Sequence, residues 1–431
     1  MRRLFLATLF AAVLLTKTDP ESAHEFSRLG TVDSLVERGT YRIDDSIFIG
    51  TVDKIYRDGH FYSHQAPMLA TLEAPVYWAI HLPGLRFNNR GRRVSTYLFS
   101  LATNGLALAL TVVFFAKILA LCGVAPPMRD VCALLWPLGT WLLPYGMVSN
   151  NHGISGLLVA ILIFLLLSIE WSGATRARMI GVGTVLGFLA TIELLPLISF
   201  VPLTLIYLMS RPDARSRGML WASVALSVPL LAHGLLNVRI TGDVIPAGFH
   251  HELFQFPESP FNDESLTGTI KYDSIGGIAK YTWEAMVAGK GFLTFAPLGL
   301  LAMVAAIVEW RWWARARGVY LVLLGGVVLS LAASLLTTNN YGGEAVGFRH
   351  AAYLAPAMLT FLIPWIADGV GGRRPISYLV MSVATASVLL MLVFAVRKPW
   401  SEMTLQRHPI GTWDEYVPIV ARIVHGDLLN P

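Results

Sequence analysis

A polar stretch near the start of the chain, residues 16–94, holds the side chains best suited to acid–base chemistry. Within it, Glu25 precedes Arg28 by three residues, so both side chains lie on one flank of the segment if it is helical. A carboxylate next to apolar surface can serve as a general base, and a guanidinium can hold phosphate oxygens through paired hydrogen bonds. The alternative interpretation is a surface salt bridge on an interfacial helix.

The segment around this pair has the pattern of an amphipathic helix over 24–38. Its apolar residues recur at spacings near 3.6, at Phe26, Leu29, Val32, Leu35 and Val36. Further along, Asp58 and Gly59 predict a tight turn. Pro67 then opens an apolar helix over 66–84, which we expect to lie along the membrane surface or dip into it.

The composition places the rest of the chain in a membrane. Of its 431 residues, 55% are hydrophobic and 14% are charged, whereas soluble domains carry about 25% charged residues. The net charge of +5 comes from short basic clusters between apolar runs, a pattern typical of membrane topology rather than of nucleic-acid binding. The two cysteines, Cys122 and Cys132, are too few for a disulfide framework or a thiolate metal site, and we expect free thiols.

Apolar runs of spanning length predict an all-α polytopic protein with about eleven transmembrane helices in a single domain over 1–395. Besides the N-terminal run, they lie at about 95–121, 130–148, 152–170, 178–194, 195–209, 219–237, 292–308, 318–336, 350–367 and 375–395. We expect the N-terminal run to be a retained helix, with a signal peptide as the alternative. Loops 16–94 and 238–291 and the tail 396–431 are predicted to be external.

Basic clusters recur in every second connector, for example at Arg2–Arg3, Arg176–Arg178 and Arg373–Arg374. The positive-inside rule therefore predicts a cytoplasmic N-terminus. One further cluster falls on the opposite side and is expected to face something anionic; it comprises Arg86, Arg90, Arg92 and Arg93.

Several motifs occur in an order that resembles one family. Glu25, Ser27 and Arg28 are followed by a helix, by Asp58-Gly59-His60-Phe61-Tyr62-Ser63, and by Ala66-Pro67. Later motifs are Asn150-Asn151-His152-Gly153, Ile192-Glu193-Leu194-Leu195-Pro196, Gly289-Lys290-Gly291-Phe292 and Tyr341-Gly342-Gly343-Glu344 with Gly347-Phe348-Arg349-His350. This order is similar to bacterial GT-C glycosyltransferases, the class of the lipid A aminoarabinose transferases and protein O-mannosyltransferases. The resemblance implies an integral-membrane enzyme that takes a sugar from a polyprenyl-phosphate carrier.

The resemblance also implies roles for particular residues. Glu25 falls at the family's acidic catalytic position, and Arg349, Arg28 and His64 are the candidates for binding the donor phosphate. The candidates for substrate contact are Tyr62, Gln65, His152, Glu193, Tyr341, Glu344 and Lys290. The chain departs from the family at His64-Gln65, where relatives commonly carry Asp-Lys, and at His24, where many carry Asn or Asp.

Other interpretations remain open for individual residues. His152 could cap a helix or lie on the surface, and Glu193 could be hydrated at a helix end rather than join the site. Adjacent His250 and His251 do not predict a metal site, because neighbouring histidines on one chain rarely point at one ion. A divalent cation at Asp44, Asp45 or Asp53 is an open alternative.

The sequence therefore predicts a multi-pass glycosyltransferase in a bacterial cytoplasmic membrane, with its active site on the external face. Its partners would be a polyprenyl-phosphate-linked sugar, an unidentified extracytoplasmic acceptor (lipid, polysaccharide or protein) and membrane lipids, and no nucleic acid. A lid or acceptor groove is expected in 238–291. The rival functions are a flippase for lipid-linked sugars and a non-catalytic scaffold of GT-C ancestry.

Overall fold

A computed structural model describes residues 1–20, 22–88, 92–261, 274–288, 291–337, 347–367 and 374–397. The first half contains α1 (Arg2–Leu15), α2 (Ala23–Arg38), β1 (Lys54–Arg57), β2 (His60–Ser63), α3 (Pro67–His81), α4 (Arg92–Ser100), η1 (Leu101–Gly105), α5 (Leu106–Leu121), α6 (Pro126–Leu138), α7 (Leu142–Tyr145), α8 (Asn151–Ser172), α9 (Arg176–Ile192), η2 (Leu195–Leu197) and α10 (Phe200–Ser210). The second half contains α11 (Arg217–Thr241), η3 (Ala247–Phe249), η4 (His251–Phe254), α12 (Ile275–Met286), α13 (Phe292–Phe295), α14 (Pro297–Val308), η5 (Trp312–Ala316), α15 (Arg317–Thr337), η6 (Arg349–Leu354), α16 (Ala355–Thr360), α17 (Pro364–Ala367) and α18 (Arg374–Arg397).

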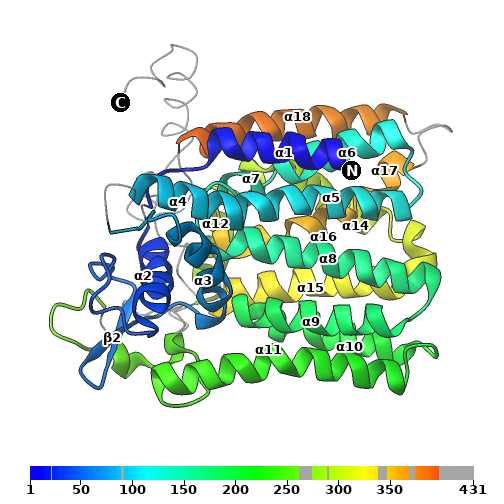
Figure 1. Cartoon of the computed structure of the whole chain (residues 1–431). Helices are drawn as coiled ribbons and strands as arrows, with labels where there is room; N and C mark the ends of the chain where they lie inside the picture. Colours follow the sequence, from blue (N-terminus) through cyan, green and yellow to red (C-terminus); the bar gives the residue numbers. More distant parts are fainter. Residues whose placement is uncertain are drawn as a thin grey trace, which may run out of the picture.

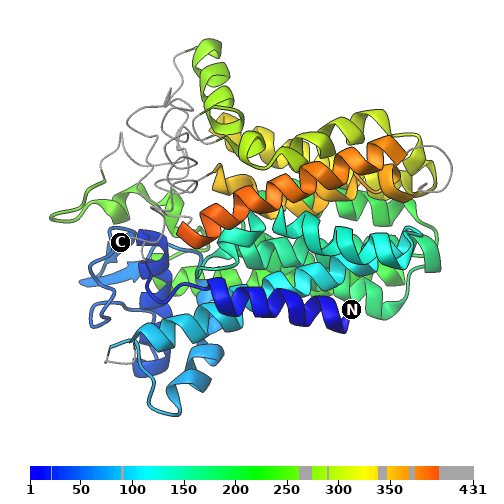
Figure 2. The ribbon, with the colours of Figure 1, turned by 90° about the horizontal axis from the view of Figure 1, so that it is seen from above.

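Most of the long helices run roughly side by side and form one bundle (Figures 1 and 2). Six stretches of the described chain are long and apolar enough to cross a membrane: Arg92–Leu121, Asn151–Ser172, Arg217–Thr241, Trp312–Leu336, Arg349–Ala367 and Pro375–Val393. The prediction of about eleven spans is not confirmed. The helices Leu195–Ser210 and Pro297–Val308 are apolar but shorter, and the run at 130–148 is divided between α6 and α7.

Small residues let neighbouring helices of the bundle approach closely. A Cβ on Gly183 of α9 would lie 2.1 Å from the Ala222 carbonyl oxygen of α11, and one on Gly187 would lie 2.8 Å from that of Leu226. In a membrane, where water does not drive helices together, such contact surfaces stabilise helix pairs through van der Waals packing. The α9–α11 pair therefore depends on glycine at both positions.

The first polar loop folds into a separate layer at one end of the bundle, where α2, α3 and the β1–β2 hairpin lie (Figure 1). The amphipathic helix predicted over 24–38 is confirmed as α2, which buries Leu29 and Val32 against Ala70 and Tyr77 of α3. The turn predicted at Asp58-Gly59 joins β1 to β2, and both residues have positive φ, at 51° and 84°.

The helix predicted over 66–84 is present as α3. It packs against α2 and α4 at the end of the bundle. It begins at Pro67, which suits the first helical position because its missing N–H has no intrahelical partner there. Trp78 and Leu82 remain exposed on its outer side, so α3 presents an apolar edge as well as a buried face.

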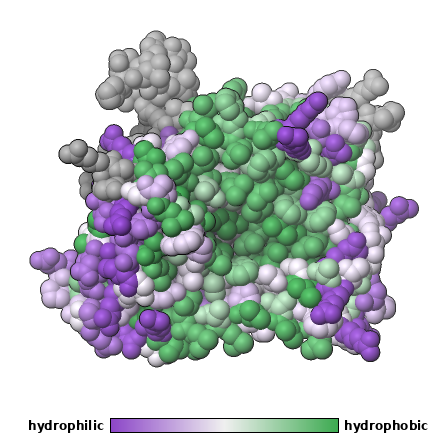
Figure 3. Space-filling view, in the orientation of Figure 1, coloured by the Kyte–Doolittle hydropathy of each residue, from purple (hydrophilic) through white to green (hydrophobic). Residues whose placement is uncertain are grey.

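The surface has the distribution expected of a membrane protein. On the face shown in Figure 3, hydrophobic side chains cover the middle of the bundle and hydrophilic ones gather toward its two ends. The α2–α3 layer forms one of these polar ends. The predicted free thiols are also confirmed, since neither Cys122 nor Cys132 forms a disulfide.

Candidate active site

The N-terminus of α2 is fixed by a capping box. The Ser22 hydroxyl accepts a hydrogen bond from the Glu25 amide at 3.1 Å, and the Glu25 carboxylate accepts one from the Ser22 amide at 3.1 Å. This reciprocal pair satisfies backbone donors that a helix start leaves without partners. The second Glu25 oxygen accepts from the Ser149 amide at 3.2 Å, so the buried carboxylate also ties α2 to the turn before α8.

One turn further along α2, Arg28 points into the protein and is only 3% exposed. Its Nη2 donates to the Asn151 side-chain oxygen at 3.2 Å. Its Nε and Nη1 have no hydrogen-bond partner in the described chain. A guanidinium has five N–H donors, so most of the donor capacity of Arg28 is available to a ligand.

Asn151 and His152, at the start of α8, both converge on Glu193. The Asn151 amide donates to Glu193 Oε1 at 2.6 Å, and Nδ1 of His152 lies 2.8 Å from the same oxygen. The interpretation of His152 as a surface residue is therefore wrong, because it is 5% exposed, and the helix is capped by Asn150 instead. Glu193 is the C-cap residue of α9. Its carboxylate forms hydrogen bonds in this network instead of being hydrated at the helix end.

Arg349 begins η6 and is buried beside the start of α2. Its Nη2 contacts Nε2 of His24, and Gln65 contacts Nδ1 of the same ring. Burial, and next the positive charge of Arg349, hold the pKa of His24 well below its usual range. The imidazole is therefore neutral, and its Nε2 can accept a hydrogen bond from the guanidinium.

Asp53 and His64 complete this second group of side chains. Nδ1 of His24 lies 3.4 Å from Asp53 Oδ2, and the rings of His24 and His64 are 5.6 Å apart. One ligand atom from each of His24, Asp53 and His64 lies within 4.8 Å of the others. Imidazole and carboxylate groups are ligands that suit zinc, and Oδ2 of Asp53 has no hydrogen-bond partner among the described residues. The three residues therefore fit a cation, although the charge of nearby Arg349 would oppose it.

The two other predicted metal ligands, Asp44 and Asp45, do not belong to this group. Asp44 lies 3.1 Å from His60 Nδ1 and accepts from the Phe61 amide at 2.9 Å, and it thereby braces the β2 strand. His250, another weak candidate, lies near Asp243 and Glu252. Burial lowers the pKa of His250, but its hydrogen bonds with these two carboxylates and their charges together raise it. These contacts are local ion pairs.

Glu73 is a buried carboxylate that the sequence analysis did not single out. It lies on α3 facing α2, is 3% exposed, and neither of its oxygens has a hydrogen-bond partner in the described structure. Burial raises its pKa to about 7, although the charge of nearby Arg28 acts in the opposite direction. Its signal in the sequence is a single charged residue inside the apolar run 68–80.

The structure thus brings together seven of the predicted site residues: Glu25, Arg28, His64, Gln65, His152, Glu193 and Arg349. Tyr62 instead packs in a cluster with Tyr41, Ile55 and Phe254, on the face of β2 opposite to Ser63. Lys290, Tyr341 and Glu344 lie outside the described residues. The residues that the sequence analysis missed are Glu73, Asn151 and the pairing of His24 with Asp53.

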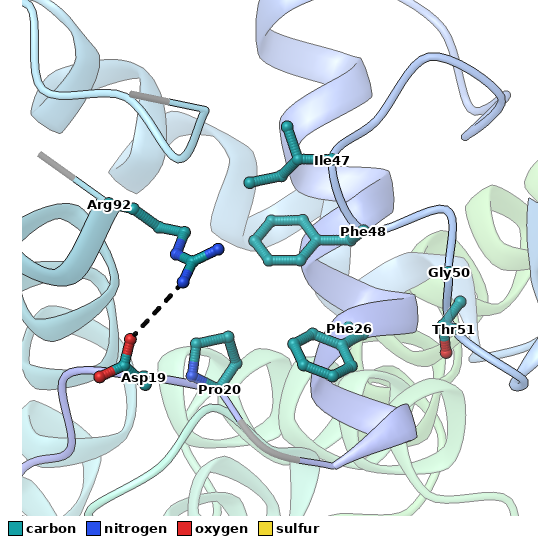
Figure 4. Close-up of a pocket in the computed structure, with 8 residues that line it drawn as sticks. All are labelled: Asp19, Pro20, Phe26, Ile47, Phe48, Gly50, Thr51 and Arg92. Atoms are coloured by element: carbon teal, nitrogen blue, oxygen red, sulfur yellow. Dashed lines mark ion pairs between the residues drawn. The ribbon is translucent and has the colours of Figure 1, made fainter. Parts of the chain in front are cut away.

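A separate cavity of about 290 Å³ lies on the other flank of α2 (Figure 4). It is lined by Asp19, Pro20, Phe26, Ile47, Phe48, Gly50, Thr51 and Arg92. The rings of Phe26 and Phe48 stack 5.9 Å apart, and Arg92 and Asp19 face each other at 4.0 Å. None of the predicted catalytic or substrate-binding residues lines this cavity, and its volume is close to the lower limit of ordinary ligand pockets, about 300 Å³.

The fold is that of GT-C membrane glycosyltransferases. The chain is similar to ArnT from Cupriavidus metallidurans solved with undecaprenyl phosphate, with a TM-score of 0.51 and 13% identity over 99% of this chain and 74% of that one. It is also similar to the Archaeoglobus fulgidus oligosaccharyltransferase tethered to an acceptor peptide, with a TM-score of 0.52 and 12% identity over 92% of this chain and 55% of the other.

A structure of the same archaeal enzyme with zinc and sulfate gives a TM-score of 0.50 and 10% identity over 95% of this chain and 57% of that one. The chain thus spans little more than half of the oligosaccharyltransferase. No protein-family model matches the sequence, and no curated protein matches it. The predicted resemblance to the GT-C class is confirmed at the level of the fold, in a multi-pass membrane protein.

Proposed function

We propose that this protein transfers a sugar from a polyprenyl-phosphate carrier to an acceptor outside the cytoplasmic membrane. The observation that carries the proposal is the burial of two arginines, Arg28 and Arg349, among carboxylates at one end of a GT-C bundle. Buried guanidinium groups are costly unless something anionic accompanies them. The carrier phosphate is the anion that a structure of this fold was solved with, in ArnT.

In this proposal the donor phosphate binds between Arg349 and Arg28, with His64 as a further donor. Relatives commonly have a lysine where this chain has Gln65. Gln65 brings no charge, but it contacts the same His24 ring as Arg349. Arg349 therefore lies close to the position of the lysine that relatives have in place of Gln65. This proximity supports a phosphate site in which Arg349 supplies the positive charge of that lysine.

Glu25 acts as the general base. It takes the proton from an acceptor hydroxyl as that oxygen attacks the anomeric carbon, while the bond from that carbon to the carrier phosphate breaks. A single displacement of this kind inverts the anomeric configuration. The tie between Glu25 and the Ser149 amide holds the carboxylate near Asn151 and His152, which we assign with Gln65 and Glu193 to contacts with the substrate.

Other predicted contributions stay part of the proposal. Lys290, Tyr341 and Glu344 are further candidate substrate contacts, and 238–291 is a candidate lid. A divalent ion held by His24, Asp53 and His64 would help to neutralise the phosphate, and the archaeal oligosaccharyltransferase solved with zinc and sulfate supports testing for one. The membrane would be the bacterial cytoplasmic membrane, with the N-terminus inside and the site outside.

The experiment that tests the proposal is native mass spectrometry of the purified protein, followed by turnover assays. The expected result is a co-purifying polyprenyl-phosphate sugar that is lost on Arg349→Ala and kept on Arg215→Ala, a change at an exposed arginine next to α11. Glu25→Gln should keep the bound carrier and lose transfer. A protein that binds no carrier, even after candidate donors are added, would contradict the proposal.

The rival functions fit the site less well. A flippase would need its ionisable groups along a path through the bundle, whereas the site residues lie where α2 meets the ends of α8 and α9. A scaffold would tolerate Glu25→Gln without any change in cellular phenotype. Loss of transfer with retained expression and carrier binding separates the enzyme from both alternatives.

A further inference from the structure

The interface between α2 and α3 contains two charged side chains, Arg28 and Glu73, with buried atoms that form no hydrogen bond to any described residue. Ala70 and Tyr77, which flank Glu73 along α3, belong to an apolar cluster with Leu29 and Val32 of α2. Glu73 lies inside this otherwise apolar contact, and both of its oxygens are without hydrogen bonds. Arg28, the residue next to Leu29, leaves Nε and Nη1 without partners.

These two side chains do not satisfy each other. They share no hydrogen bond. The positive charge of Arg28 nevertheless stabilises the ionised form of Glu73. Both residues are 3% exposed, so bulk water does not solvate them freely. A buried donor or acceptor without a partner is destabilising, and native structures that keep such groups commonly do so where a ligand or an ordered water completes them.

The unsatisfied atoms define what the missing partner must offer. Nε and Nη1 of Arg28 are donors only. Glu73 offers acceptor oxygens in both of its protonation states, and it is an acceptor only when it is ionised. The partner must therefore present an oxygen with lone pairs to α2 and an O–H or N–H group to α3. A bare phosphate meets the first requirement and not the second, whereas a sugar with several hydroxyl groups meets both.

We infer that Arg28 and Glu73 form a two-point receptor for the sugar-phosphate end of the donor, with Glu73 accepting a hydrogen bond from a sugar hydroxyl and Arg28 donating to an oxygen of the phosphate. The inference rests on the proposed function and assigns to Glu73 the recognition of the sugar rather than of the carrier. Arg28 lies where the sugar and the phosphate of the donor would meet. Its Nη2 is held there by the hydrogen bond to Asn151, which in turn donates to Glu193.

Discrimination between donors follows from this arrangement. A site that hydrogen-bonds a substrate hydroxyl rejects analogues that lack the hydroxyl, because its buried polar groups are then left without partners. Bare polyprenyl phosphate should therefore bind through the arginines alone. The same carrier with a hexose should gain affinity through Glu73.

The test compares the affinities of the purified protein, in lipid nanodiscs, for polyprenyl phosphate and for the same carrier bearing one hexose. In the wild type, the sugar-bearing carrier should bind about tenfold more tightly, which corresponds to about 1.4 kcal/mol. Glu73→Ala should bring the ratio close to one while leaving the affinity for the bare carrier unchanged. Arg28→Gln should weaken both.

Glu37→Gln is the matched control. Glu37 lies on the same helix as Arg28, but its carboxylate already has partners in His81 and Arg86, at 3.3 and 3.5 Å. This variant should retain the wild-type ratio. Glu73→Gln provides a second variant of similar shape, in case the alanine change prevents folding.

Two outcomes would overturn the inference. If Glu73→Ala and Glu73→Gln leave the ratio of affinities unchanged, water or structural packing occupies the interface and the sugar binds elsewhere. If either change weakens both carriers equally, Glu73 acts through the fold of the site. A wild type that binds neither carrier would instead remove the proposed function itself, and the inference with it.

Discussion

Replacing Glu73 with glutamine should change how the stability of the protein depends on pH. In the folded protein burial raises the pKa of Glu73 to about 7 from its ordinary value of 4.5. Because the folded state holds the proton more tightly than the unfolded chain, stability is lost as pH rises from about 4.5 to 7. Below that window both states are protonated, and above it the full penalty for a buried carboxylate remains.

The magnitude follows from the difference between these two pKa values. One pKa unit corresponds to about 1.4 kcal/mol, so the shift amounts to about 3 kcal/mol between pH 4.5 and pH 8. Glutamine does not titrate. The free energy of unfolding of Glu73→Gln relative to the wild type should therefore rise by about 3 kcal/mol over that range.

Thermal unfolding followed by tryptophan fluorescence, at a series of pH values in one detergent, measures this effect. The unfolding entropy typical of globular chains implies that the difference in Tm between variant and wild type changes by about 3 °C between pH 5 and pH 8 for a chain of this length. Parallel Tm profiles for Glu73→Gln and the wild type would refute the argument that Glu73 is buried without a partner.

Three further outcomes are expected. Ser22→Ala removes the side-chain cap of α2 and should lower stability by about 1 kcal/mol in a chemical unfolding titration; no loss would mean that the capping box contributes little. Gly183→Val puts side-chain atoms against the α11 backbone, so the yield of monodisperse protein in size-exclusion chromatography should fall sharply, and unchanged yield would contradict the close α9–α11 contact. Ile47→Trp, which fills the cavity of Figure 4, should reduce sugar transfer without displacing bound carrier if that cavity takes the acceptor. The control is Val52→Trp, a similarly exposed position outside the cavity; equal activity of the two variants would exclude the cavity from acceptor binding.

Local pattern was enough to predict the polar layer and its main helix. The apolar spacing from Phe26 to Val36 predicts α2 because one helical face must be buried. The Asp58-Gly59 pair predicts the hairpin turn because glycine readily adopts positive φ. The long apolar runs at 95–121 and 152–170 predict helices because a membrane interior leaves backbone groups no other partner.

The count of spans was harder to predict, because hydropathy does not mark where a helix breaks within an apolar run. Pro137 lies near the end of α6, and α7 starts only at Leu142, so the run at 130–148 forms two short helices rather than one long one. The predicted division between 178–194 and 195–209, in contrast, is close to the observed one, since α9 ends at Ile192 and α10 begins at Phe200. The stretches Asn151–Ser172 and Arg217–Thr241, by comparison, each form one uninterrupted helix.

The sequence by itself determined the kinds of chemistry available: carboxylates, histidines and arginines in the polar loop 16–94, with Glu25 and Arg28 as the main candidates there, and Arg349 far along the chain added by the family resemblance. Only the tertiary structure decided their environment. Helix packing places Arg349 beside His24, although 325 residues separate them in the chain, and places Glu73 in an apolar interface. Burial, lost hydrogen bonds and altered pKa values arise from contacts between distant segments, and no local spacing encodes them.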